Sequence, residues 1–323
     1  MTDTPYDRLS PELMLEAIDA RGFRTDGTLT SLNSYENRVY QVGIEEDEPV
    51  IAKFYRPQRW TDAAIREEHA FTIELADAEL PVVAPMLRDG ETLFIDEEFR
   101  FAMFPRRAGQ PPNIEDPDVM EVLGRTIGRM HAIGAVKVFD HREVLTAQGF
   151  GHDSRAYLLD NGFIPDELVE AYASLTEHLL ERIDAAMALD HRRIRTHGDS
   201  HLGNLLWRYD APNFVDFDDT RMAPAIQDLW MLLSGERPDR TAQLSELIDA
   251  YEDFFAFDKR EVVLIEPLRT LRMMHHAAWI ARRWNDPAFP RAFPWFNSLK
   301  YWSDHVLSLR EQLAALDEAP LYI

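Results

Sequence analysis

The chain has 323 residues, of which 46% are hydrophobic, so it is long enough to bury more than one hydrophobic core. Its formal net charge is −23, and a surface this acidic repels nucleic acids and anionic membranes. The lack of cysteine excludes disulfides and thiolate metal sites. No run of about 18 uncharged apolar residues occurs, and the acidic start MTDTPYDRLS does not resemble a secretory signal. We therefore expect a cytoplasmic protein without nucleic-acid or membrane partners.

The N-terminal third of the sequence predicts a mostly β lobe. A helix is expected over 10–22, because Ser10 can cap it, Pro11 suits the first helical position and Gly22 can end it. A second helix is expected over 61–76, with Thr61 as its cap. Alternating apolar residues and polar turns predict strands over 29–44 (strand, turn, strand), 49–57 and 91–105 (two strands).

The remainder of the chain predicts a mostly helical lobe. A Pro-, Gly- and Asp-rich stretch at 106–118 has the composition of a linker. Beyond it, helices are expected over 119–134, 165–189, 223–235 and most of the remainder to 316. A short hairpin is expected over 204–217. We therefore predict an α+β fold of two lobes, with an N-terminal lobe at 1–105, a hinge at 106–112 and a C-terminal lobe at 113–323. Nothing in the sequence indicates oligomerisation, and we expect a monomer.

The segment THGDSHLGNLL concentrates polar residues between two apolar runs. Asp199 and Asn204 lie in it, with glycines that allow a tight turn. The predicted hairpin would bring Asp216, in VDFDD, back beside Asn204. A carboxylate and an amide oxygen are suitable ligands for Mg²⁺, and Asp199 is then free to accept a proton from a hydroxyl. This arrangement matches the requirements of phosphoryl transfer.

Two histidines in the same segment allow another interpretation. His197 and His201 alternate with Asp199, so the three could face one Zn²⁺ ion on a strand. A zinc hydrolase would usually need further histidine ligands, which other parts of the chain could supply. For the histidines alone, a structural role in a polar turn is the more ordinary interpretation.

Phosphoryl transfer also needs a cation for the nucleotide phosphates. Lys53, in VIAKFY, is one of only four lysines in the chain and lies in a predicted apolar strand. The following helix carries Glu67 and Glu68, either of which could pair with it as a strand lysine and a helix glutamate do in kinases. We prefer Glu68, with Glu67 as the alternative.

Several motifs together resemble a known family. HGDSHLGN and VDFDD, with AKFY upstream and AIQDLW downstream, are similar to the aminoglycoside phosphotransferase and choline kinase branch of the protein-kinase-like fold. SYEN and RRWNDPAFP resemble more closely a bacterial group of serine/threonine protein kinases of the stress response within that branch. The resemblance extends over about residues 10–316 and implies a bilobal protein-kinase-like fold with an antiparallel sheet in the N-lobe.

The resemblance also implies roles for individual residues. Asp199 would be the proton acceptor, while Asn204 and Asp216 would hold Mg²⁺. Asp228 would brace the catalytic loop without taking part in the chemistry. On the nucleotide side, ATP would be bound by the residues Ser34 (over the phosphates), Lys53 (at the phosphates), Glu68 (orienting Lys53) and Phe104 (bordering the adenine).

Two departures from ordinary protein kinases matter. The turn at 31–38 has no glycine, so phosphates would have to meet side chains such as Ser34 or Asn37 and backbone N–H groups. The metal motif reads DFD rather than DFG, and no A-P-E segment follows it, which argues against activation-loop regulation. Both departures fit the aminoglycoside kinase branch.

We therefore predict an ATP- and Mg²⁺-dependent kinase that phosphorylates Ser or Thr hydroxyls of a protein substrate. The main alternative is a kinase of the same fold for an aminoglycoside, choline or another amino-alcohol, since the acidic surface would suit a cationic substrate. A nucleotide-binding pseudokinase is a third possibility, which the intact set of Lys53, Asp199, Asn204 and Asp216 opposes.

Overall fold

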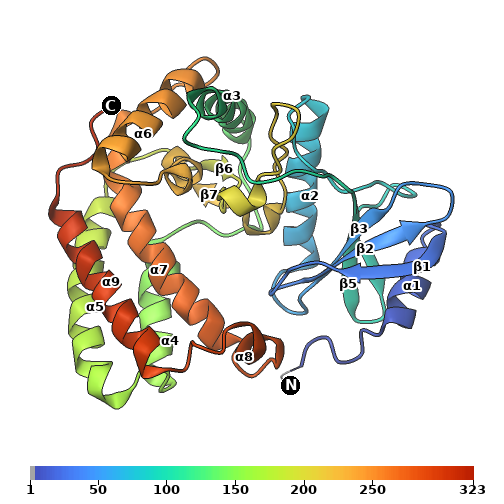
Figure 1. The fold of residues 1–323 in the computed structure, drawn as a ribbon, viewed down its shortest axis with the longest axis horizontal. Helices are drawn as coiled ribbons and strands as arrows, with labels where there is room; N and C mark the ends of the chain where they lie inside the picture. The colour runs from blue at the N-terminus through green and yellow to red at the C-terminus, as the bar shows by residue number, and fades with distance from the viewer. Residues whose placement is uncertain (1–3) are drawn as a thin grey trace.

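The computed structural model describes residues 4–323, which form two lobes joined by an extended connection (Figure 1). The first three residues of the predicted N-terminal lobe lie outside the described residues. Buried hydrophobic side chains gather in one cluster inside the N-terminal lobe and a larger one in the helical lobe. In this part of the chain, no helix is long and apolar enough to cross a membrane. The predicted bilobal α+β architecture is confirmed.

The N-terminal lobe is built on an antiparallel sheet of five strands in the order β1-β2-β3-β5-β4. The strands are β1 (Thr25–Ser31), β2 (Arg38–Ile44), β3 (Val50–Tyr55), β4 (Phe94–Asp96) and β5 (Phe99–Pro105). Alternation along β3 turns Ala52 and Phe54 toward one buried cluster, where α1 packs, whereas Lys53 and Tyr55 face the other side. Lys53 is thereby aimed at the junction between the lobes.

Both predicted helices of this lobe are confirmed with their N-terminal caps, although the first ends at Asp19, before Gly22. Helix α1 (Pro11–Asp19) begins after Ser10, whose hydroxyl accepts a hydrogen bond from the backbone N–H of Leu13. Helix α2 (Asp62–Asp77) begins after Thr61 in the same way. Helix α2 stands between the sheet and the helical lobe, and its Phe71 belongs to the hydrophobic core of the helical lobe (Figure 1).

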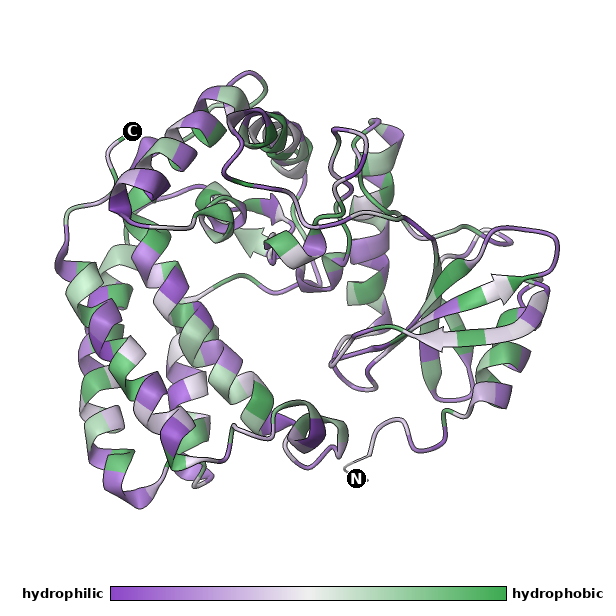
Figure 2. Cartoon of the chain, in the orientation of Figure 1, coloured by the Kyte–Doolittle hydropathy of each residue, from purple (hydrophilic) through white to green (hydrophobic). Residues whose placement is uncertain are grey.

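The C-terminal lobe is mostly helical. Its helices are α3 (Pro117–Gly134), α4 (Asp153–Asp160), α5 (Asp166–Met187), α6 (Arg237–Tyr251), α7 (Ile265–Arg282), α8 (Ala288–Ala292) and α9 (Leu299–Asp317). They carry hydrophobic and hydrophilic residues side by side, as expected of helices that bury one face (Figure 2). The short strands β6 (Ile194–Thr196) and β7 (Arg221–Ala223), which the sequence did not predict, pair antiparallel at the start of the segment THGDSHLGNLL.

The predicted hairpin at 204–217 is also present. The backbone N–H of Leu206 donates to the carbonyl of Asn213 at 3.0 Å, and the reverse bond measures 2.9 Å. Nearer the ends of the hairpin, the N–H of Val215 donates to the carbonyl of Asn204 at 3.0 Å. Asp216 is therefore held next to Asn204, as the sequence predicts.

The predicted helix over 223–235 is wrong. This segment forms two 3₁₀ turns, Ala225–Asp228 and Trp230–Leu232, separated at Leu229. Pro224 lies before the first turn, and every residue from 225 to 230 is buried. A segment buried on all sides has no solvent-facing stripe, and here tertiary contacts decide its backbone path rather than helical propensity.

Helices α3 and α6 approach closely at two glycines. A Cβ atom on Gly128 would lie 2.5 Å from the carbonyl oxygen of Tyr251, and one on Gly124 would meet the carbonyl of Leu247. The two glycines are one helical turn apart, so together they form the flat face on which α6 lies.

We predict that Gly128→Ala lowers the free energy of unfolding, measured by urea denaturation. Alanine improves helix propensity by roughly 1 kcal/mol, but overpacking against the α6 backbone costs about 1–3 kcal/mol. The control is Gly149→Ala, because a Cβ there meets only the Thr146 hydroxyl at 3.6 Å. Equal stability of the two variants would contradict the close approach of α3 and α6.

Candidate active site

The loop that follows β6 is fixed by a buried carboxylate. Asp228 accepts hydrogen bonds from the backbone N–H groups of His197 at 2.7 Å and Gly198 at 2.9 Å. The Nε2 atom of His131 lies 3.0 Å from the same carboxylate oxygen that accepts from His197. Burial raises the pKa of Asp228, but the hydrogen bonds and the nearby imidazoles outweigh it and hold the pKa below its usual value. Asp228 thus stays ionised and sets the direction in which the loop leaves the strand.

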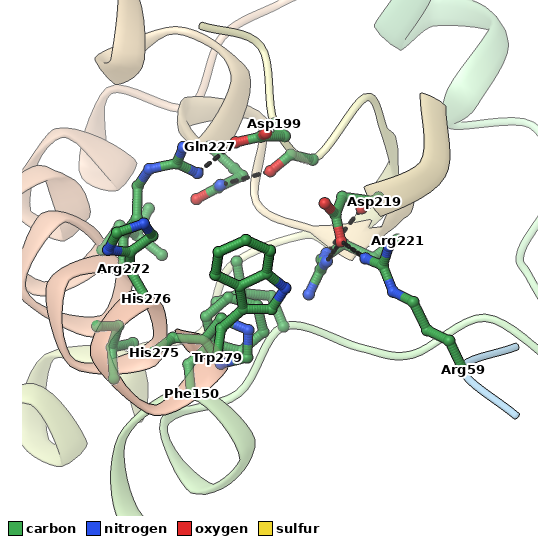
Figure 3. A pocket seen from close by; sticks show the side chains of 14 residues that line it. Arg59, Phe150, Asp199, Asp219, Arg221, Gln227, Arg272, His275, His276 and Trp279 are labelled. Atoms are coloured by element: carbon green, nitrogen blue, oxygen red, sulfur yellow. Dashed lines mark hydrogen bonds and ion pairs between the residues drawn. The ribbon is translucent and has the colours of Figure 1, made fainter. Parts of the chain in front are cut away.

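The loop presents Asp199 to a cavity between the lobes. One carboxylate oxygen contacts the guanidinium of Arg272 on α7 (Figure 3). The other lies 3.4 Å from Nε2 of His201. Burial alone would raise the pKa of Asp199, but the His201 hydrogen bond and the positive charge of Arg272 move it well below its usual range. Asp199 is therefore an ionised and oriented carboxylate, a group that can accept a hydrogen bond from a hydroxyl.

Asn204 and Asp216 lie side by side and offer oxygen atoms. The side-chain amide of Asn204 donates to the Asp199 carbonyl at 2.9 Å, which leaves its own carbonyl oxygen without a donor among residues 4–323. Asp216 adopts the left-handed conformation, with φ 61°, and its side chain is 54% exposed. Only one of its two oxygens, Oδ1, has a partner within the described chain, the Lys53 ammonium at 2.8 Å. Two free hard oxygens in one place fit Mg²⁺, which keeps waters and phosphates as its other ligands.

The histidines are engaged in other ways. His197 is fully buried, and its Nε2 lies 3.0 Å from the Val215 carbonyl while its Nδ1 accepts from the N–H of Asp199. His201 uses Nδ1 to accept from the N–H of Gly203 at 2.9 Å. Across residues 4–323, no group of three or more His, Asp or Glu side chains is arranged to hold a metal ion. This geometry gives the zinc interpretation no support.

Lys53 is buried and surrounded by three carboxylates. Its ammonium nitrogen lies 2.8 Å from Asp216, 3.3 Å from Asp218 and 3.8 Å from Glu68. Burial alone would lower the pKa of Lys53, but these carboxylates raise it well above its ordinary value. Glu67 points elsewhere and accepts three backbone N–H groups from residues 140–142. Of the two glutamates, the structure therefore places Glu68 beside Lys53.

Two residues at this junction were missed in the sequence. Asp218 lies closer to Lys53 than Glu68 does, and it contacts the Arg59 guanidinium. Arg59, in KFYRPQRW of the N-terminal lobe, also donates to Asp219 at 2.9 Å. The sequence did offer one indication of Asp218: VDFDD contains more carboxylates than a single metal ligand requires. Their basic partner lies far away in the sequence, so spacing alone could not identify it.

The glycine-free turn before β2 is braced from both lobes. Ser34 donates to the carbonyl of Asn37 at 2.9 Å. The Asn37 amide donates to Asp218 at 3.2 Å and accepts from the N–H of Arg56 at 3.0 Å, so both its polar groups already have protein partners. Ser34 thus lies on the turn, while the buried side chain of Asn37 supports the turn from below through its hydrogen bonds.

Glu36 ties the same turn to α7. Its carboxylate accepts from Nε1 of Trp279 at 2.5 Å and from Nε of Arg283 at 2.9 Å. The ring of Tyr35 packs on Phe293 at 4.9 Å between centroids. The lobes are consequently bridged on the side opposite the chain connection.

Phe104 lies on the same face of the sheet as Lys53, but its ring packs against neighbouring side chains of the N-terminal lobe. It is half-buried, with its ring edge-on to His69 at 6.3 Å, and it joins a small cluster with Tyr55 and Ile65. The structure therefore places Phe104 near the chain connection, without assigning it a contact to a nucleotide.

The cavity in front of Asp199 has a volume of about 130 Å³. One face of α7 forms its wall through Leu268, Arg272, His275 and Trp279, which recur at helical spacing. Figure 3 shows the Trp279 ring facing Asp199 and Asp219 across the space. This helix face was missed in the sequence, where the polar and aromatic residues of RMMHHAAWIARR carried the signal.

Comparisons with known proteins agree with this geometry. Residues 28–263 match the phosphotransferase enzyme family. The chain is 43% identical over 318 residues to stress response kinase A of Escherichia coli (strain K12), covering 98% of this chain and 97% of the relative. It is 42% identical over the same length to the serine/threonine protein kinase RdoA of Salmonella typhimurium, with the same coverage. Among solved structures, amicoumacin kinase hAmiN, in complex with AMP-PNP and Ca²⁺, superposes with a TM-score of 0.74 at 17% identity, over 96% of this chain and 94% of that one.

The two relatives match almost the whole chain, whereas the family match ends at residue 263, before α7. The protein is a kinase: it belongs to the phosphotransferase enzyme family and, within that family, to the stress response kinase A group.

Proposed function

We propose that this protein is an ATP- and Mg²⁺-dependent serine/threonine protein kinase of the bacterial stress response, acting in the cytoplasm as a monomer. The name of one relative, serine/threonine protein kinase RdoA, supports the protein substrate, and the name stress response kinase A supports the role in the stress response. The observation that carries the proposal is the cavity at Asp199, whose size and charge favour an amino-acid side chain over a polycationic antibiotic.

The size of the cavity limits the acceptor. Pockets for small molecules usually measure about 300–1,000 Å³, whereas this cavity measures about 130 Å³. A serine or threonine side chain fits such a space, which is smaller than the usual pocket for a molecule the size of a multi-ring aminoglycoside.

The charge of the cavity points the same way. Three arginines line it, together with the carboxylates Asp199 and Asp219. His275 is neutral at physiological pH, because burial and the nearby Arg221 lower its pKa to about 3. Both carboxylates are already paired with arginine, so a polycationic acceptor would find few free negative charges.

The nucleotide would bind on the other side of Asp199. Lys53 would contact the phosphates, oriented by Glu68 and by Asp218. Ser34 would lie over the phosphates, together with backbone N–H groups of its turn, and Asn37 would support the turn from below. Phe104 would border the adenine.

The chain itself positions the reacting groups. Mg²⁺, held by Asn204 and Asp216, would neutralise charge on the phosphates. Asp199 would align the acceptor hydroxyl in line with the γ-phosphoryl group and take its proton. Positioning of this kind supplies most of the rate enhancement in phosphoryl transfer.

We predict that Asp199→Asn lowers phosphate transfer by about 10²–10⁴-fold, the usual contribution of a general base, while ATP affinity stays nearly unchanged. The assay is transfer of radiolabelled γ-phosphate to a generic protein acceptor and, separately, to a panel of aminoglycosides and amino-alcohols. Label in a small molecule would replace the protein substrate by the amino-alcohol alternative. ATP binding without any transfer by the wild type would indicate a pseudokinase. A loss of ATP affinity equal to the loss of transfer would contradict the role of Asp199.

We further predict that Asp216→Ala weakens ATP binding in the presence of Mg²⁺ but has little effect on binding in EDTA, because a metal ligand is lost. Titration calorimetry under both conditions measures the difference. Asp249→Ala is the control, since Asp249 is exposed on α6 and has no ion pair within residues 4–323. Unchanged metal dependence in Asp216→Ala would rule out Asp216 as a ligand.

A further inference from the structure

Arg272 is a cation at Asp199 with unused hydrogen-bonding capacity. A guanidinium group carries five N–H donors, yet in the part of the chain that the structure describes the contact to Asp199 is its one hydrogen bond or ion pair. Its side chain is 41% exposed and lines the cavity. The remaining donors are therefore available to a group that enters the cavity.

The other two arginines of the cavity are not available in this way. Arg59 and Arg221 both donate to Asp219, at 2.9 and 2.7 Å, and Arg59 also contacts the buried Asp218. Arg221 donates a further hydrogen bond to the backbone carbonyl of Asp219 at 2.8 Å. Their charges hold the VDFDD segment in place. Arg272 is thus the arginine of this cavity that can respond to the reaction.

The fold supports Arg272 without depending on it. Helix α7 is anchored by buried apolar residues, among them Leu271 and Met274. The guanidinium projects into the cavity toward Asp199 (Figure 3). Arg272 is not one of the residues of that hydrophobic core, so truncation of its side chain mainly removes a charge from the site.

The charge balance of the transfer gives Arg272 a role. The acceptor oxygen forms a bond to the γ-phosphorus as the bond from that phosphorus to the β,γ-bridging oxygen breaks, and the electrons of the broken bond leave with ADP. The acceptor proton passes to Asp199, which becomes neutral and loses its attraction for Arg272. Negative charge meanwhile remains on the transferring phosphoryl oxygens.

We propose that Arg272 is a further catalytic residue, whose guanidinium binds the oxygens of the phosphoryl group as it moves to the acceptor held at Asp199. In the resting enzyme the same guanidinium pairs with Asp199 and keeps it oriented. The inference rests on the proposed function of Asp199 as proton acceptor. Arginine suits the task because its planar fork binds two phosphoryl oxygens at once.

The test compares Arg272→Ala and Arg272→Lys with the wild type. We expect Arg272→Ala to lower kcat by at least about 10²-fold, as for loss of one transition-state donor or of an arginine finger, with little change in KM for ATP. Lysine should restore part of the rate, because it keeps the charge but loses the fork. Guanidinium ion, added well below denaturing concentrations, should partly rescue the alanine variant. Arg310→Ala is the charge-matched control, since Arg310 is exposed on α9 and has no ion pair in the described chain.

Three outcomes would overturn the proposal. An unchanged kcat in Arg272→Ala would remove any role in the chemistry. A raised KM for the acceptor with unchanged kcat would make Arg272 an acceptor-binding residue instead. A lowered kcat that neither lysine nor guanidinium restores, with a lowered melting temperature, would assign it a structural role.

The failure of the proposed function can be distinguished from these outcomes. The kcat of each variant is compared with that of the wild type, using whichever acceptor the wild type phosphorylates: protein, amino-alcohol or water. Transfer to water is measured as release of ADP. If protein is not labelled, the protein-kinase proposal fails. The comparison of Arg272 variants then proceeds on the acceptor that is labelled.

Discussion

A buried set of alternating charges at the junction of the lobes holds this site together. Charges taken out of water cost several kcal/mol each unless they are closely paired. Here each buried cation has a carboxylate within reach, and removing any member would leave a partner uncompensated. The set comprises Lys53, Arg59 and Glu68 from the N-terminal lobe and Arg142 and Asp218 from the C-terminal lobe, with the half-exposed Asp216 at its edge. Docking of the lobes and assembly of the site are therefore one event.

Helix α2 shows how this constraint reaches the fold. Its Glu68 pairs with Arg142 at 2.6 Å and lies near Lys53, while Phe71, on the same helix, enters the core of the C-terminal lobe. A helix that contributes to both the ionic junction and the far core cannot move with one lobe alone. The position of Lys53 relative to Asp216 is consequently fixed by packing as well as by charge.

The sequence predicted those parts of the site that depend on local spacing. Asp199 and Asn204 share one loop, and a short hairpin returns Asp216, so their proximity follows from a few residues of backbone. The partners of Asp218 could not be predicted in this way. Arg59 is 159 positions away in the chain, and nothing local distinguishes it from the other surface-type arginines. The wrong prediction of a helix at 223–235 also reflects tertiary contacts, because residues 225–230 are all buried and therefore show no helical periodicity.

The glycine-free turn and the cavity both show that local contacts outweigh global composition. No residue of 31–38 has a positive φ, so the turn needs no glycine. The turn is held instead by Trp279 and Arg283, which donate hydrogen bonds to its Glu36 from the end of α7. The acidity of the whole chain suggested a cationic substrate, but fields are screened over about 8 Å at physiological salt. At Asp199 the relevant charges are those on the cavity wall, where three arginines face two carboxylates. A protein with a net charge of −23 can thus present a cavity whose wall carries more arginines than carboxylates.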